Sequence, residues 1–209
     1  MSLEPARAAE RISAFWDGAE ADHSLRRRLA ASLVDRLNGK RSIMCDVNTR
    51  TIPARKVLCL KRLVDGEAGA WAMGKEFIGL LRSHDLPQIE GREGAAFCIY
   101  WGEVSEDSDG PMEWCRPVPD DQAEALAASI PELSLRTEAG HEEAFVHLGP
   151  AGETTPAEWQ LVSESLRTWA DANAVHPVNL GVRITYLASP PITASSVPDC
   201  DFAVPIATI

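Results

Sequence analysis

The sequence predicts an α+β fold made of a duplicated βαββ-like unit, with an antiparallel sheet that carries its helices on one face. Three observations support this prediction: short alternating segments typical of strands, two amphipathic helical segments, and a recurring spacing of 88 residues between matching positions. We expect an N-terminal helical segment at residues 1–42 and the duplicated domain at residues 43–209, with halves at about 43–119 and 120–209.

The first half combines strand patterns with one helical pattern. Alternation of apolar and polar residues at 43–49 is typical of a half-buried strand. Apolar residues at 67–84 fall on one helical face, which predicts an amphipathic helix. The other expected elements of this half are strands at 57–60, 95–104 and 112–118, preceded by helices within 4–40.

The second half starts the same pattern again. The segment Thr155-Pro156-Ala157-Glu158 is a strong helix start, with a capping threonine, a proline in the first turn and a glutamate that closes a capping box. The other expected elements are a short helix at 120–130 and strands at 133–137, 143–148, 180–187 and 200–206.

A constant spacing relates the two halves. The segment EWCRPV aligns with DFAVPI, so that Glu113 matches Asp201 at a spacing of 88 residues. Two halves of any strand–helix–strand protein can share an apolar pattern without a duplication. That general similarity does not explain the paired acidic, aromatic and proline positions. Further pairs at this spacing are Trp71 with Trp159, Ile78 with Leu166, Leu58 with Val146 and Leu60 with Leu148. One supersecondary unit used twice is therefore predicted.

Side-chain alternation decides which residues of the last strands share a face. Glu113 and Cys115 share one face, and Asp201 takes the equivalent place, whereas Trp114 and Phe202 point to the opposite face and are expected under the helices. The two carboxylates are then expected to converge on a ligand groove along the pseudo-two-fold axis. The alternative is that both are solvent-exposed strand acids.

A carboxylate in a partly apolar groove needs a compensating partner, and a cationic ligand is one such partner. Aromatic rings on the neighbouring strands would add cation–π attraction of about 0.5–2 kcal/mol each. The predicted ligand-binding residues are Glu113, Asp201, Tyr100, Trp101, Tyr186 and Cys115.

Composition excludes several classes of function. The formal net charge of −11 opposes direct contact of this chain with nucleic acid. No apolar run is long enough for a transmembrane helix, and the first residues are not a signal peptide. The five cysteines form no C-x-x-C pair and are interpreted as reduced core residues, which indicates the cytoplasm. With scattered histidines as well, neither a metal site nor a cofactor is expected.

Catalysis is permitted by these residues but not indicated by them. Two carboxylates and a tyrosine can transfer protons. The sequence contains no nucleophile elbow, phosphate-binding glycine loop or HExxH motif, and the glycines at 91 and 94 are interpreted as part of a plain loop.

Three segments resemble one known family. The segment FCIYWGEVSEDSDGPMEWCRPVP at 97–119 resembles the first half of gyrase-inhibitor-like effector-binding domains. The ends ITYLASPP and CDFAVPI resemble the matching part of the second half, and VNTRTIPARKVLCLKR resembles the entry strand. The resemblance covers about residues 43–209.

The resemblance implies a sensor domain of MerR-type or AraC-type transcription regulators that binds amphipathic, often cationic molecules between its halves. A buried acid on the last strand commonly contacts the cation, and this chain has Asp201 where the family usually has glutamate. Some members hydrolyse cyclopropane-containing compounds, but the stretch YLASPPIT lacks the acids typical of the family at that place.

Three functions are compatible with these residues and with the resemblance. The first is a ligand sensor of a transcription regulator, either truncated or free-standing. The second is a hydrolase of small electrophilic xenobiotics that uses the same groove, and the third is an inhibitor module whose acidic surface blocks a nucleic-acid site. The helices within 4–40 are expected to be a linker to a DNA-binding domain, a dimerisation helix that makes a homodimer, or an extra element of the sensor.

Overall fold

The computed structural model describes residues 45–86, 89, 91–105, 108–148, 156–177, 181–187 and 199–208. The expected helices within 4–40, the boundary at 42/43, the Thr155 cap and most of the stretch YLASPPIT lie outside the described residues. The elements are β1 (Val47–Ile52), β2 (Arg55–Val64), α3 (Gly66–Ser83), η2 (Arg92–Gly94), β3 (Phe97–Tyr100), β4 (Gly110–Val118), α4 (Ala123–Ser129), β5 (Ser134–Glu138), β6 (His141–Leu148), α5 (Pro156–Ala172), β7 (Val175–Pro177), β8 (Val182–Tyr186) and β9 (Cys200–Thr208).

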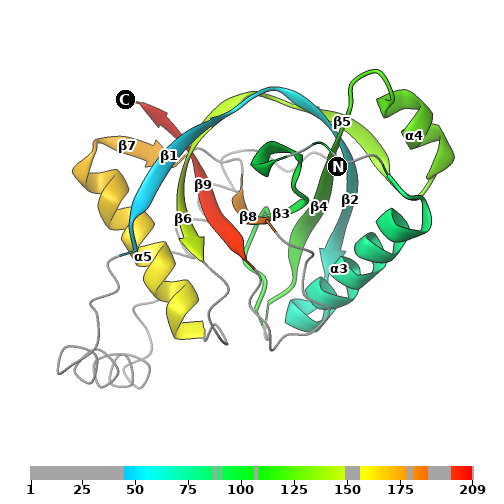
Figure 1. Cartoon of the computed structure of the whole chain (residues 1–209). Helices are drawn as coiled ribbons and strands as arrows, with labels where there is room; N and C mark the ends of the chain where they lie inside the picture. The colour runs from blue at the N-terminus through cyan, green and yellow to red at the C-terminus, as the bar shows by residue number, and fades with distance from the viewer. Residues whose placement is uncertain are drawn as a thin grey trace, which may run out of the picture.

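The α+β class and the antiparallel sheet are confirmed. The strands form one curled sheet in the order β1-β6-β9-β8-β3-β4-β2-β5, with the short β7 beside β9 (Figure 1). This order is symmetric between the two halves. Each strand of the first half has a counterpart in the second, β1 with β5, β2 with β6, β3 with β8 and β4 with β9. When counterparts are exchanged, the order stays the same but runs from the other end of the sheet. A duplicated unit predicts this order, although the duplication itself stays a prediction.

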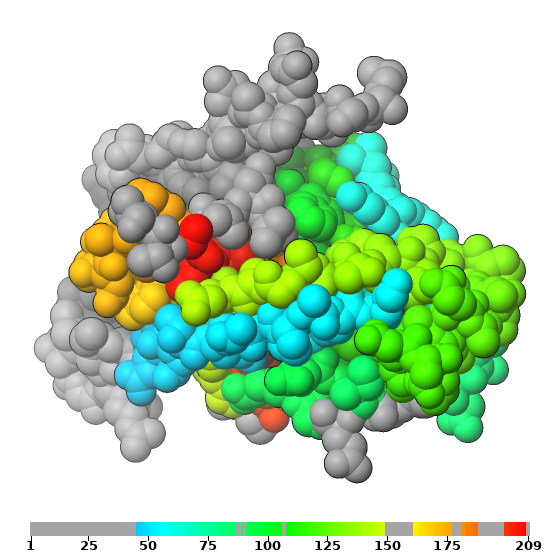
Figure 2. Space-filling model, turned by 90° about the horizontal axis from the view of Figure 1, so that it is seen from above, coloured from blue at the N-terminus to red at the C-terminus, as the bar shows by residue number. Residues whose placement is uncertain are grey.

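Two long strand pairs cross the sheet as an arch. Only Pro53 and Ala54 separate β1 from β2, and only Ala139 and Gly140 separate β5 from β6. β1 pairs with β6 and β2 pairs with β5, so the two chain segments run antiparallel over the top of the arch, where Figure 2 shows β1 and β6 side by side. A Cβ on Gly140 would lie 3.1 Å from the backbone nitrogen of Ala54, so a residue without a side chain suits this crossing.

The apolar core lies between the helices and one face of the sheet, which we call the outer face. Phe77 of α3 and Leu166 of α5 are buried there with Trp114 and Phe202 of the sheet. The rings of Phe77 and Trp114 are 5.7 Å apart, and Trp114 stacks on Tyr186 at 5.2 Å. Burial of each large apolar side chain contributes about 1.5–3 kcal/mol. The predicted placement of Trp114 and Phe202 under the helices is confirmed.

The strand register corrects the constant spacing of 88. Lys61 on β2 lies opposite Glu113, and His147 on β6 lies opposite Asp201. If the two acids are equivalent, β2 and β6 match at a spacing of 86, and not at the spacing of 88 that pairs Leu58 with Val146. A shift of two residues leaves every side chain on the same face, so the apolar pattern cannot distinguish 86 from 88.

Candidate functional site

The inner face of the sheet, turned away from α3 and α5, carries four buried carboxylates. Glu113, Glu138, Glu143 and Asp201 are at most 3% exposed, and Asp201 is fully buried. A buried charge is tolerated only when it is paired. The partners of these four acids therefore define the chemistry of the inner face.

The Asp201 end of the inner face gathers two guanidinium groups and an imidazole around one carboxylate. Arg50 of β1 donates from Nη1 to Asp201 Oδ2, His147 Nδ1 lies 3.0 Å from Oδ1, and Arg92 Nε lies 3.4 Å from Oδ2. The guanidinium groups of Arg50 and Arg92 also lie over the ring of Phe145, at 4.4 and 5.6 Å from its centroid. A carboxylate and an aromatic ring therefore act together on guanidinium groups here.

Glu143 shares one of these cations. Arg50 Nε donates to Glu143 Oε1 at 2.7 Å, and His141 Nε2 lies 3.4 Å from Oε2. Burial raises the pKa of Glu143, but the contact with His141 and the charge and hydrogen bond of Arg50 together outweigh burial and leave the pKa below its ordinary value. Glu143 is consequently ionised at neutral pH.

The Glu113 end holds its carboxylate differently. Arg136 of β5 donates from Nε to Glu113 Oε1 at 2.8 Å and from Nη2 to Oε2 at 3.2 Å, and Trp101 Nε1 donates to Oε2 at 3.1 Å. Arg136 Nη2 also lies 3.5 Å from Cys115 Sγ, which is itself 3.5 Å from Cys59 Sγ. Burial lowers the pKa of Arg136, but the hydrogen bond to Glu113 and the nearby charges of Cys115, Cys59 and Glu113 together outweigh burial, so the pKa is raised.

The two ends repeat one pairing. Arg136 follows Arg50 by 86 residues, the same spacing that relates β2 to β6. In both cases an acid on the last strand of one half binds an arginine on the first strand of the other half. Internal guanidinium groups thus supply the compensation that the sequence pattern assigned to a ligand.

A third ion-pair group lies on the same face. Glu138 binds Arg55 at 2.6 Å and also binds Arg183 Nη1, and both guanidinium groups lie over the ring of Phe97. Burial raises the pKa of Glu138, but the charges of Arg183 and Arg55 outweigh burial and leave the pKa lowered. Arg55 also donates to the backbone oxygen of Glu93 in η2.

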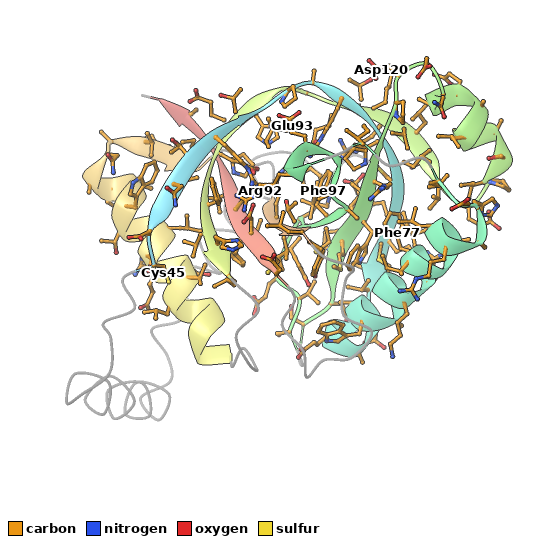
Figure 3. All side chains as sticks on the ribbon, viewed as in Figure 1. Cys45, Phe77, Arg92, Glu93, Phe97 and Asp120 are labelled. Atoms are coloured by element: carbon orange, nitrogen blue, oxygen red, sulfur yellow. The ribbon has the colours of Figure 1, made fainter. Side chains whose placement is uncertain are left out.

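The short turn η2 lies beneath the arch, and Figure 3 shows Arg92 and Phe97 there. Gly91 has a φ of 76°, and a Cβ on Gly94 would lie 1.8 Å from the Ile89 oxygen, so both positions require glycine. The side chain of Arg92 is nevertheless 42% exposed. The interpretation of this segment as a plain loop missed its contact with Asp201.

The structure brings four of the six predicted residues to the inner face and separates them into two ends. Asp201 lies at one end, whereas Glu113, Cys115 and Trp101 lie at the other. The described contacts give the two carboxylates no common partner, so their expected convergence is not seen. The groove and the ligand-binding role of these residues stay predictions.

The two tyrosines lie on the outer face, so their predicted position beside the carboxylates was wrong. Tyr186 stacks on Trp114, and Tyr100 packs against the same core. Burial raises the pKa of both phenols well above the ordinary value. Because successive side chains of a strand point to opposite faces of the sheet, Tyr100 and its neighbour Trp101 are expected on different faces.

One grouping on the described part of the chain has the composition of a metal site. The ligand atoms of Cys59, Glu113 and Cys115 lie within 4.8 Å of one another. The spacing of cysteines in the sequence does not reveal it, because the two cysteines are 56 residues apart. No helix among the described residues is long and apolar enough to cross a membrane.

Comparison with known proteins gives a structural likeness. No protein-family model matches the sequence, and no curated protein matches it. The EcmrR C-terminal domain has a TM-score of 0.56 at 14% identity, over 78% of this chain and 98% of that domain. EcmrR in a complex with DNA has a TM-score of 0.58 at 14% identity, over 96% of this chain and 77% of that chain. A hydrolase from Listeria innocua has a TM-score of 0.50 at 11% identity, over 83% of this chain and 98% of that chain. At these identities the likeness establishes the fold.

Proposed function

We propose that this chain, which has the gyrase-inhibitor-like fold, is a small-molecule effector-binding domain of a bacterial transcription regulator or of a relative of one. Its ligand is a cationic, amphipathic molecule that binds at the Asp201 end of the inner face. The likeness to EcmrR, seen in complex with DNA, supports the regulator part of the proposal. A cytoplasmic location belongs to the same proposal.

The contact of Arg92 with Asp201 and Phe145 carries the proposal for the ligand. A fully buried carboxylate and an aromatic ring hold a guanidinium group that is 42% exposed and belongs to a short turn. An organic cation offers the same two interactions, charge pairing and cation–π attraction. Arg92 therefore occupies the place that a cationic ligand would take.

Charge balance favours an exchange of cations at this end. Asp201 already faces the guanidinium groups of Arg50 and Arg92, so a cation that entered while Arg92 stayed would meet like charge. If the ligand replaces Arg92, the number of charges beside Asp201 stays the same and the displaced guanidinium returns to water. Arg50 is less suited to leave because it also binds Glu143.

A fluorescence titration tests this proposal. Rhodamine 6G, a cationic aromatic dye, is added to the wild type and to Asp201→Asn, Phe145→Leu and Arg92→Gln, while the emission of the six tryptophans is followed. We expect saturable binding that weakens about tenfold or more in Asp201→Asn, or about 1.4 kcal/mol. Phe145→Leu should weaken binding about two- to fivefold, whereas Arg92→Gln should strengthen it.

Two controls make the result specific. Arg62→Gln removes an exposed arginine that pairs with Glu76 of α3 on the outer side, and it should leave the affinity unchanged. Fluorescein, an anionic dye of similar shape, should bind less tightly than rhodamine 6G. Equal affinity for both dyes, or indifference to Asp201→Asn and Phe145→Leu in variants that circular dichroism shows to be folded, contradicts the proposal.

The hydrolase alternative has one observation in its favour, the likeness to a structure described as a hydrolase. The hydrogen bonding of the inner face argues against it, because the carboxylates of Glu113 and Asp201 are already occupied by hydrogen bonds from arginine. Incubation of the chain with a cyclopropane-containing electrophile, followed by mass spectrometry, separates the two functions. Product formation that is lost in Glu113→Gln or Asp201→Asn would favour the hydrolase.

A further inference from the structure

Two cysteines face each other at the Glu113 end of the inner face. Cys59 of β2 and Cys115 of β4 are direct partners in the antiparallel register, and their Sγ atoms lie 3.5 Å apart. The two residues are 1% and 0% exposed. Glu113 precedes Cys115 by two positions on the same face, which brings a carboxylate oxygen within 4.8 Å of both sulfur atoms.

We propose that Cys59, Cys115 and Glu113 bind a soft divalent metal ion, with two thiolates as the principal ligands and the carboxylate as the third. Thiolate ligands select soft and borderline ions such as Cd²⁺ and Zn²⁺ over Mg²⁺ and Ca²⁺. Tetrahedral zinc has metal–sulfur distances of about 2.3 Å, which separates two sulfur ligands by about 3.8 Å. The observed separation of 3.5 Å therefore needs only a small adjustment of the two side chains.

Charge balance selects a divalent ion. Glu113 and Arg136 already cancel each other's charge. Two thiolates and one divalent ion together carry no net charge, so a divalent ion leaves the buried cluster neutral. A monovalent ion would leave an uncompensated negative charge in the same place.

The surroundings of the cluster suit such a site. Arg136 contacts both Glu113 and Cys115 and is 32% exposed, so it can turn toward water to admit an ion and still remain near the carboxylate. Apolar side chains pack around the sulfur atoms; they are Val57, Phe97, Ile99 and the partly buried Trp101. Low polarity strengthens the attraction between thiolates and a divalent ion. The site is separate from the Asp201 end and does not depend on the proposed ligand.

Titration of the reduced chain with Cd²⁺ tests the proposal. The ultraviolet charge-transfer band of thiolate-bound cadmium reports the metal, and a pH indicator in weak buffer reports released protons. We expect one ion per chain and two protons released per ion. Cys59→Ser and Cys115→Ser should each abolish tight binding, and Glu113→Gln should weaken it about tenfold or more while the thiolate band remains.

Two other cysteines serve as matched controls. Cys98→Ser removes a buried thiol from the outer face, and Cys45→Ser removes a more accessible thiol. Both variants should bind Cd²⁺ as the wild type does. No uptake by the wild type, a band that survives in Cys59→Ser, or an equal loss in Cys98→Ser would overturn the proposal. If a serine variant does not fold, the alanine variant replaces it, because alanine buries no hydroxyl group.

Discussion

The two ends of the inner face use one pairing in two ways. At the Glu113 end a single guanidinium binds the carboxylate through two nitrogen atoms, and the Trp101 indole completes the contact. At the Asp201 end Arg50, Arg92 and His147 share one carboxylate, and Arg92 belongs to a short turn rather than to a strand. Among the described residues the first carboxylate has one arginine partner, from a strand, whereas the second also contacts an arginine of a turn, and we propose that a ligand replaces this arginine. The same acid–arginine pairing therefore has different surroundings at the two ends.

The largest expected difference between the two ends is in stability. Asp201→Asn leaves Arg50 and His147 beside a fully buried amide, so we expect a loss of about 3 kcal/mol in the free energy of unfolding. Glu113→Gln leaves only Arg136, which is 32% exposed and can turn to water, so a loss of about 1–2 kcal/mol is expected. Urea unfolding of both variants measures the difference. Equal losses would show that the two ends are held alike.

Much of this arrangement could be predicted from the sequence because it depends on local pattern. Alternation placed Glu113 and Asp201 on the face away from the helices, and the apolar spacing at 67–84 placed α3 within one residue of its bounds. The same alternation separates Tyr100 from Trp101, and the prediction that grouped the tyrosines with the acids did not apply it.

The partners of the acids could not be predicted because they depend on strand register. Arg50 and Asp201 are 151 residues apart and meet only because β1 pairs with β6 and β6 with β9. Cys59 and Cys115 are likewise brought together by the pairing of β2 with β4, which no spacing of cysteines in the sequence indicates. Apolar patterns fix the face of a strand but leave its register free by two residues.

Acid should distinguish the Asp201 end, which includes Glu143, from the third ion-pair group around Glu138 by a smaller difference in stability. The pKa values of Glu138 and Glu143 are lowered in the folded chain, so both acids contribute stability above the unfolded pKa of about 4.3 and lose it as pH falls through the folded value. We expect the free energy of unfolding to fall from about pH 5 downward. Glu138→Gln should reduce that slope more than Glu143→Gln, because Glu138 alone holds Arg55 and Arg183. Urea unfolding across about pH 3–6 measures both slopes, and an unchanged slope in Glu138→Gln would contradict the assignment.

The smallest expected effect concerns the outer face, where Tyr186 stacks on Trp114 and Tyr100 packs nearby. Removal of either hydroxyl group touches neither end of the inner face, so Tyr100→Phe and Tyr186→Phe should change the affinity for rhodamine 6G by less than about twofold, or about 0.4 kcal/mol. The same titration used for Asp201→Asn checks this. A tenfold loss in either tyrosine variant would place the ligand among the residues under the helices. The exchange of cations at Asp201 would then have no part in binding, and the difference between the two ends would serve stability alone.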